Sequence, residues 1–192
     1  MKKIKLISLI LIVVLSLTIF TACDKKDDQP NDNDNNQTEN NDNNQGQEKN
    51  KEDEYGIIVE DEQVAYTDDS GAELVLKKKP EKTVILFSSF IDIWVKNGGT
   101  LIGMTEDELT HDVPGLENVQ GVGRTGGLSL EKIISLEPEL VILSMGTTEQ
   151  REMIPALKEN NIEVLALEYI GKDDYYRIAS LFSKINDRED LY

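Results

Sequence analysis

The chain has 192 residues, a formal net charge of −17 and a single cysteine. One cysteine excludes an intramolecular disulfide. So acidic a chain also argues against nucleic-acid binding, because proteins that bind the phosphate backbone carry basic patches. The length suits one ordinary domain with a tail.

The first 22 residues have the three-part layout of a secretory signal peptide. Three lysines form a basic start, an apolar run of about 15 residues follows at 6–20, and two small residues, Thr21 and Ala22, end the segment. The apolar run is shorter than the roughly 20 residues that a membrane-spanning helix needs. The sequence therefore predicts an exported protein.

The small residues directly before Cys23 resemble a bacterial lipobox, in which the cysteine is acylated and becomes the new N-terminus. Phe20 stands where leucine is usual in that motif. We expect the protein to be held by this lipid on the extracytoplasmic face of the cell membrane. The alternative is ordinary signal cleavage that leaves a free thiol.

Residues 24–54 are rich in Asn, Asp, Gln, Glu and Lys and contain no Val, Ile, Leu, Met or aromatic residue. Such a segment has nothing to offset the entropy of ordering it, so a disordered spacer is predicted. A flexible coil of this length spans roughly 30 Å. The expected organisation is a signal peptide at 1–22, a lipidated cysteine with its spacer at 23–54, and a folded domain at 55–192.

From residue 55 onward, short apolar runs alternate with helical patterns. Strands are predicted at 57–59, 64–67, 72–76, 83–87, 100–104, 140–143 and 162–167, and helices at 89–96, 128–136, 148–160 and 173–185. Ser129 is the expected N-cap of the second helix, and 105–120 is predicted to be a polar loop. Short, wholly apolar strands separated by helices indicate an α/β fold, a parallel sheet sandwiched by helices.

Ligands of open α/β sheets gather at the carboxyl ends of the strands. The residues expected there offer hydroxyls, glycines, aromatic rings and one arginine. Arg124 is the sharpest candidate, because a guanidinium can bind a carboxylate or hydroxamate group through two hydrogen bonds. The alternative is an exposed loop arginine without a role. The candidate ligand-binding residues are Ser88, Ser89, Phe90, Arg124, Thr125, Gly126, Ser144, Met145, Gly146 and Tyr169.

The sequence contains few of the residues that catalysis requires. His111 is the only histidine, and no cluster of histidines, cysteines or spaced carboxylates suggests a metal site. We expect no enzyme, no bound metal and no cofactor. Residues 121–126 fit the dinucleotide pattern GxGxxG, but a poor strand precedes them and no acid ends a strand about 20 residues later, so an oxidoreductase is a weak alternative.

Three stretches resemble the binding proteins of ABC importers for ferric siderophores and cobalamin. They are 66–76 (YTDDSGAELVL) with 80–84 (PEKTV), 121–123 (GVG) with 130–142 (LEKIISLEPELVI), and 161–164 (NIEV). Glu139 replaces the usual aspartate, and Asn161 and Glu163 replace a glycine and a proline. The likeness covers about residues 64–190.

This resemblance implies one lobe of a two-lobed fold whose lobes face each other across a ligand cleft. It implies an iron chelate, haem or cobalamin as ligand, and an ABC permease as partner. Glu131 matches the glutamate that docks onto a permease arginine, although an acid in the first turn of a helix is also favoured by the helix dipole.

The resemblance also implies a chain roughly twice as long, so a truncated product that lacks the second lobe is expected. A lone lobe offers half the contacts of a cleft, whereas small ligands are normally enclosed on most of their surface. The alternative function is therefore an interaction protein or a non-functional remnant that docks a permease through Glu131 without delivering ligand.

Overall fold

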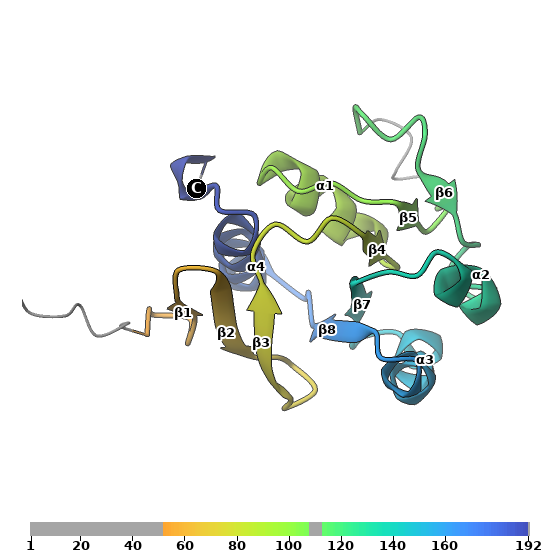
Figure 1. The fold of residues 1–192 in the computed structure, drawn as a ribbon, viewed down its shortest axis with the longest axis horizontal. Helices are drawn as coiled ribbons and strands as arrows, with labels where there is room; N and C mark the ends of the chain where they lie inside the picture. Colours follow the sequence, from red (N-terminus) through yellow and green to blue (C-terminus); the bar gives the residue numbers. More distant parts are fainter. Residues whose placement is uncertain (1–51, 108–112, 192) are drawn as a thin grey trace, which may run out of the picture. The chain divides into compact units, whose positions relative to one another are not determined.

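The computed structural model describes residues 52–107 and 113–191. The predicted signal peptide, Cys23, most of the predicted spacer and His111 lie outside these residues. The described part contains a five-stranded parallel sheet with four helices and a three-stranded antiparallel sheet (Figure 1).

The parallel sheet has the strand order β6-β5-β4-β7-β8. Its strands are β4 (Thr83–Ile85), β5 (Gly103–Met104), β6 (Gln120–Gly121), β7 (Leu140–Ser144) and β8 (Glu163–Leu167). Every residue of β4 and β7 is buried, as is all of β8 after its first residue. Strands buried on both faces appear in a sequence as continuous apolar runs, which is why this sheet was predictable. The α/β class is confirmed.

Successive residues of the central strands face two separate cores, because side chains alternate across a strand. Ile85 and Ile142 pack into one core with α1 (Ser88–Lys96) and α4 (Lys172–Ile185). Val84 and Val141 pack into the other with α2 (Leu130–Ser135) and α3 (Thr148–Glu159). The helices therefore cover both faces of the sheet, two on each, as Figure 1 shows.

The antiparallel sheet contains β1 (Ile58–Val59), β2 (Gln63–Thr67) and β3 (Glu73–Lys77) in that order. Buried and more exposed residues alternate along β2 and β3. The buried residues pack into the core of α1 and α4, and they are Val64, Tyr66, Leu74 and Leu76. The intervening residues of β3 are exposed. This is the half-buried pattern of an antiparallel sheet that covers a core on one face.

The turn between β2 and β3 closes the outer edge of β8. The backbone N–H of Asp69 donates to the carbonyl of Ala166, and the N–H of Ala166 donates to the Asp68 carboxylate, both at 3.0 Å. The N–H of Glu168 donates to Asp69 at 2.7 Å. An uncovered edge strand is a template for aggregation, so these contacts protect the sheet as well as fixing the hairpin on it.

Arg177 of α4 joins the hairpin to the parallel sheet. Its guanidinium donates to the Tyr66 hydroxyl, to the Asp69 carboxylate at 3.0 Å, to the carbonyl of Glu168 at 3.1 Å and to Asp174 at 3.3 Å. The Arg177 side chain is only 16% exposed. Burial raises the pKa of the Tyr66 phenol, while the charge of Arg177 acts in the opposite direction.

The predicted elements agree with the structure apart from their ends and one strand. Ser129 caps α2 as predicted, its hydroxyl accepting the N–H of Lys132 at 3.2 Å. The prediction for 105–120 was wrong at its end, where Gln120 and Gly121 form β6, a strand too short to leave an alternating pattern. Pro155 lies inside α3 without ending it.

Candidate functional site

The five parallel strands end at one edge of the sheet, and each is followed there by a loop. The predicted candidates follow four of these strands: Ser88, Ser89 and Phe90 begin α1 after β4, Ser144 ends β7, and the others lie in the loops after β6, β7 and β8. The loop after β5, which holds Glu106 and Asp107, was not among them. A binding surface is therefore expected at this edge, where the carboxyl ends of the parallel strands lie.

Arg124 lies in the loop between β6 and α2, and its side chain is exposed. Within the part of the chain that the structure describes, its guanidinium makes no hydrogen bond or ion pair. The backbone of this loop is tight: Gly123 has a φ of +110°, and a Cβ there would lie 2.5 Å from the carbonyl oxygen of Gly127. A residue with a side chain would not fit at position 123.

Asp107 holds one side of the Arg124 loop. Its carboxylate accepts the hydroxyl of Thr125 at 2.7 Å, the N–H of Thr125 at 3.2 Å and the hydroxyl of Thr105 at 2.8 Å. Partial burial raises the pKa of Asp107, but the bonds from Thr125 and Thr105, with the charge of Arg124, outweigh burial and leave this pKa below its usual value. Asp107 is thus held as an anion next to Arg124.

Glu149, in the first turn of α3, holds the other side. Its two carboxylate oxygens accept the N–H of Gly126 at 2.7 Å and the N–H of Leu128 at 2.9 Å. The N–H groups of Thr125 and Gly126 and the hydroxyl of Thr125 therefore already donate to carboxylates of the protein. Of the three loop residues predicted as ligand contacts, Arg124 is the one whose side-chain donors form no hydrogen bond with another described residue.

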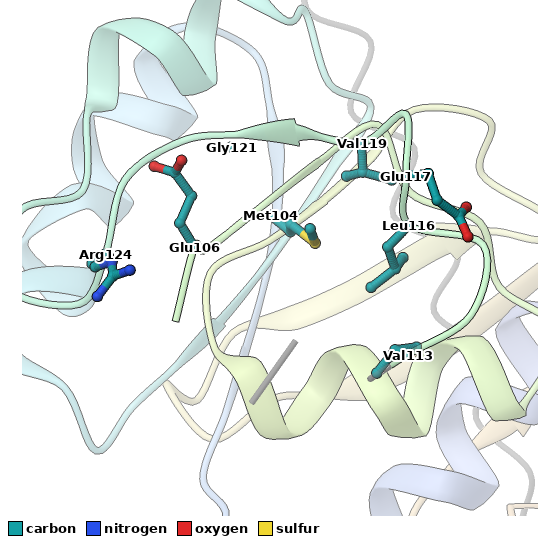
Figure 2. Close-up of a pocket in the computed structure, with 8 residues that line it drawn as sticks. All are labelled: Met104, Glu106, Val113, Leu116, Glu117, Val119, Gly121 and Arg124. Atoms are coloured by element: carbon teal, nitrogen blue, oxygen red, sulfur yellow. The ribbon is translucent and has the colours of Figure 1, made fainter. Parts of the chain in front are cut away.

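A cavity of about 430 Å³ lies beside Arg124 (Figure 2). Figure 2 shows Glu106 and Arg124 at one end, and Met104, Val119 and Leu116 with the carboxylate of Glu117 toward the other. The Glu106 carboxylate lies over Gly121, so close that a Cβ at position 121 would be 2.5 Å from its oxygen. The lining residues are Met104, Glu106, Val113, Leu116, Glu117, Val119, Gly121 and Arg124.

The sequence did not predict most of these lining residues as part of a site, because they lie in or beside 105–120, where the sequence predicts only a polar loop. Apolar residues at 113, 116 and 119 were the available signal, since a loop that only meets solvent has no need of three apolar residues at such spacing.

The loop after β7 is built around buried polar groups. Ser144 is 3% exposed, and its hydroxyl accepts the N–H of Gly146 at 3.1 Å. The buried amide of Gln150 accepts the N–H of Ser144 at 2.7 Å and donates to the carbonyl of Leu86 at 2.9 Å, which joins β7 to β4. Arg151 donates to the carbonyl of Met145. Gly146 is the exposed residue of this loop and Met145 is half-buried.

The first turn of α1, which follows β4, meets the loop after β8 through aromatic rings. Phe90 has no exposed surface, and its ring packs 6.3 Å from Tyr169 and 6.4 Å from Phe182, centroid to centroid. A ligand at the edge could not reach the Phe90 ring in this structure, which lies in the core beside Tyr169. Ser88 is buried, whereas Ser89 and Tyr169 are half-buried.

Glu131 is exposed in the first turn of α2, where the helix dipole favours an acid. Its predicted docking role stays a prediction. The GxGxxG pattern does not form a phosphate cradle here, because the N–H groups of Thr125 and Gly126 already donate to carboxylates. In residues 52–107 and 113–191 no group of three or more His, Cys, Asp or Glu side chains could hold a metal ion.

No family model matches the chain, and a search of curated proteins finds no relative. Solved structures do share its fold. The petrobactin-binding protein YclQ from Bacillus subtilis matches with a TM-score of 0.55 and 20% identity, over 67% of this chain and 47% of that protein. The molybdate periplasmic binding protein MolA of Haemophilus influenzae matches with a TM-score of 0.56 and 17% identity, over 66% and 47%.

The periplasmic vitamin B12 binding protein BtuF of Vibrio cholerae matches with a TM-score of 0.51 and 18% identity, over 59% of this chain and 44% of that protein. These neighbours are substrate-binding proteins and not enzymes. The chain spans less than half of each, so its fold is that of part of a periplasmic binding protein. Among the helices of the described residues, none has the length and apolar character needed to cross a membrane.

Proposed function

We propose that this chain is a solute-binding lipoprotein of an ABC importer, with an iron-siderophore complex or a related cobalamin or haem chelate as its ligand. The observation that carries the proposal is Arg124. An exposed guanidinium that makes no hydrogen bond or ion pair with any residue the structure describes stands on a loop fixed on one side by Asp107 and on the other by Glu149.

A fixed arginine suits an anionic ligand. Its planar donors match carboxylate or hydroxamate oxygens in pairs, and a loop held in advance loses little entropy when the ligand binds. The cavity beside it continues onto the apolar surface of Met104, Val119 and Leu116, which fits a ligand with both charged and hydrocarbon parts. The proposed ligand surface consists of Arg124, these three cavity residues and, along the same edge of the sheet, Ser89, Met145, Gly146 and Tyr169.

The place of the protein in the cell follows from its N-terminal sequence. Acylated Cys23 would anchor the chain to the cell membrane, and the polar spacer would hold the domain on the extracytoplasmic side. Glu131, exposed on α2, is the proposed contact with the permease. The whole binding site and the transport step are proposals, because the chain spans less than half of the binding proteins it matches.

The test is a thermal-shift titration of the full chain, purified in detergent, against ferric siderophores, haem, cobalamin and molybdate. A ligand that binds the folded state raises the midpoint of unfolding in proportion to the logarithm of its concentration. We expect one iron chelate to do so, and Arg124→Gln to abolish the shift. Lys158→Gln, which removes an exposed charge from the last turn of α3, is the matched control and should keep it.

A cooperative transition that no chelate moves would contradict ligand binding by this chain. The alternative function, docking to a permease without ligand delivery, would then remain. Comparing capture of the permease by the wild-type protein and by the Glu131→Arg variant would test it.

A further inference from the structure

The strand β3 has an open edge. Its residues pair with β2 on one side, and no strand among the described residues pairs with it on the other. The N–H of Lys78 donates to the carbonyl of Glu62 and that of Asp68 to the carbonyl of Ala72, so the hydrogen-bonded pairs of this ladder fall at even-numbered residues. The backbone groups of Glu73, Val75 and Lys77 therefore point away from β2.

The same three residues present their side chains to solvent. Glu73 and Lys77 are exposed, and Val75 between them is 59% exposed, an unusual value for a valine in a strand. Within the described residues neither Glu73 nor Lys77 has an ion-pair partner. The edge borders an open depression of about 260 Å³, lined by Val75, Leu76, Lys77, Pro80, Glu139, Leu140 and Glu163.

We propose that the edge of β3 is an interaction surface for a second copy of this chain, which adds its own β3 in antiparallel orientation about a two-fold axis at Val75. In that register Val75 of one copy lies opposite Val75 of the other, and Glu73 of each copy lies opposite Lys77 of the other. Like residues meet at the axis and opposite charges meet on either side of it, which is the self-complementarity that a two-fold interface requires.

The backbone supports the same register. In an antiparallel pair the outward groups of alternate residues bond to each other, so three residues on each copy form three hydrogen-bonded pairs. Leu74 and Leu76 remain on the core face, and the two small sheets become one of six strands. A slip by one residue would set the outward backbone groups of one copy opposite residues of the other whose groups already bond to β2, and these hydrogen bonds would be lost. A parallel arrangement would set Glu73 beside Glu73 and lose the charge pairs.

The chain's own N-terminal tail is the less suitable occupant. Residues 24–54 hold no β-branched residue other than one threonine and no aromatic residue, and they are rich in Asn and Asp, which disfavour strands. Two five-residue strands bury far less than the roughly 1,200 Å² of a stable complex. The dimer is accordingly weak and depends on concentration.

Cysteine cross-linking tests the register directly. The full chain in detergent carries Cys23→Ser, so that Val75→Cys supplies its one thiol. Directly opposed residues of a hydrogen-bonded antiparallel pair have Cα atoms about 5.5 Å apart, within the range that a disulfide spans. We expect mild oxidation to give a covalent dimer from Val75→Cys. Thr67→Cys, exposed on β2 away from the edge, controls for chance encounters in the micelle and should stay monomeric.

Charge reversal then tests the pairing. Glu73→Lys alone, and Lys77→Glu alone, place like charges opposite each other, and each should lower the yield of the Val75→Cys dimer about tenfold. The double variant Glu73→Lys with Lys77→Glu restores opposite charges and should restore the yield. Both residues are exposed, and thermal unfolding checks that the single variants fold. Absence of the dimer, or single variants that cross-link as well as the double one, would overturn the proposal.

Discussion

Glu149 and Gly126, 23 residues apart in the sequence, are joined by a hydrogen bond of 2.7 Å from the glycine N–H to the glutamate carboxylate. The second carboxylate oxygen accepts the N–H of Leu128. One side chain of α3 thus fixes the loop that carries Arg124, and it does so from the helix turn where an acid is electrostatically favoured.

We therefore expect Glu149→Gln to loosen this loop. The oxygen of a glutamine amide can accept one of the two N–H groups, but its NH₂ group would face the other N–H, donor against donor. Hydrogen bonds to a charged group contribute about 1.5–3 kcal/mol. The variant should lose about 1–2 kcal/mol of unfolding free energy in urea. Trypsin should also cut the native protein after Arg124 faster. Glu152→Gln, on the next turn and exposed, is the control, and equal cleavage of the two variants would count against the clamp.

Asp107 gives the stability of the protein a specific pH dependence. Its pKa is lower in the folded protein than the ordinary 3.8, so its contribution is complete above that value and disappears as the pH falls through the lower folded pKa. Asp107→Asn should be less stable than the wild type at pH 7, and the difference should shrink below about pH 4. Urea unfolding of both proteins at pH 7, 5 and 3 tests this. If the difference in unfolding free energy between the two proteins is the same at all three pH values, the charge of Asp107 does not contribute to stability.

The sequence predicted the elements of this fold much better than the contacts of the site. Runs such as 140–143 and 164–167 are apolar because the strands are buried on both faces, and that information is local. The clamps of Asp107 and Glu149 on the 124–128 loop join residues 18 to 23 positions apart, and no local pattern distinguishes them from solvated acids. Phe90 shows another limit of the sequence: it was predicted as a ligand contact because it follows a strand, but its ring has no exposed surface and packs in the core.

Arg177 should be the most important single contact between the hairpin and the parallel sheet. Arg177→Met keeps much of the apolar stem but leaves the partly buried Asp69 carboxylate without its cation and the Tyr66 hydroxyl without the hydrogen bond that it accepts from Arg177. Removing one partner of such a charged network costs more than the pair contributes, and allowing for the exposure of Asp69 we expect a loss of about 2 kcal/mol. Tyr66→Phe, which removes one hydrogen bond, should cost about 1 kcal/mol. Equal losses in denaturant unfolding would contradict the central role of Arg177.

Trp94 provides a fluorescent probe of the packing of α1. The indole N–H donates to the carbonyl of Thr100 at 2.9 Å, and the ring lies so close to Gly99 that a Cβ there would be 2.2 Å from the indole nitrogen. Trp94 has no exposed surface and is enclosed by buried side chains such as Phe182, 5.0 Å away between ring centroids. The ring therefore cannot move aside without disturbing the core.

Gly99→Ala should consequently destabilise the protein by about 1–3 kcal/mol, the usual cost of overpacking. Because the chain has one tryptophan, its emission reports this position alone. We expect a red shift of the native emission if the indole loses its enclosed position and its bond to Thr100. Gly171→Ala is the matched control, since a Cβ at position 171 meets nothing within 4 Å. A Gly99→Ala protein with the stability and emission of that control would show that the ring has room to adjust, and that Gly99 is not required by its contact with Trp94.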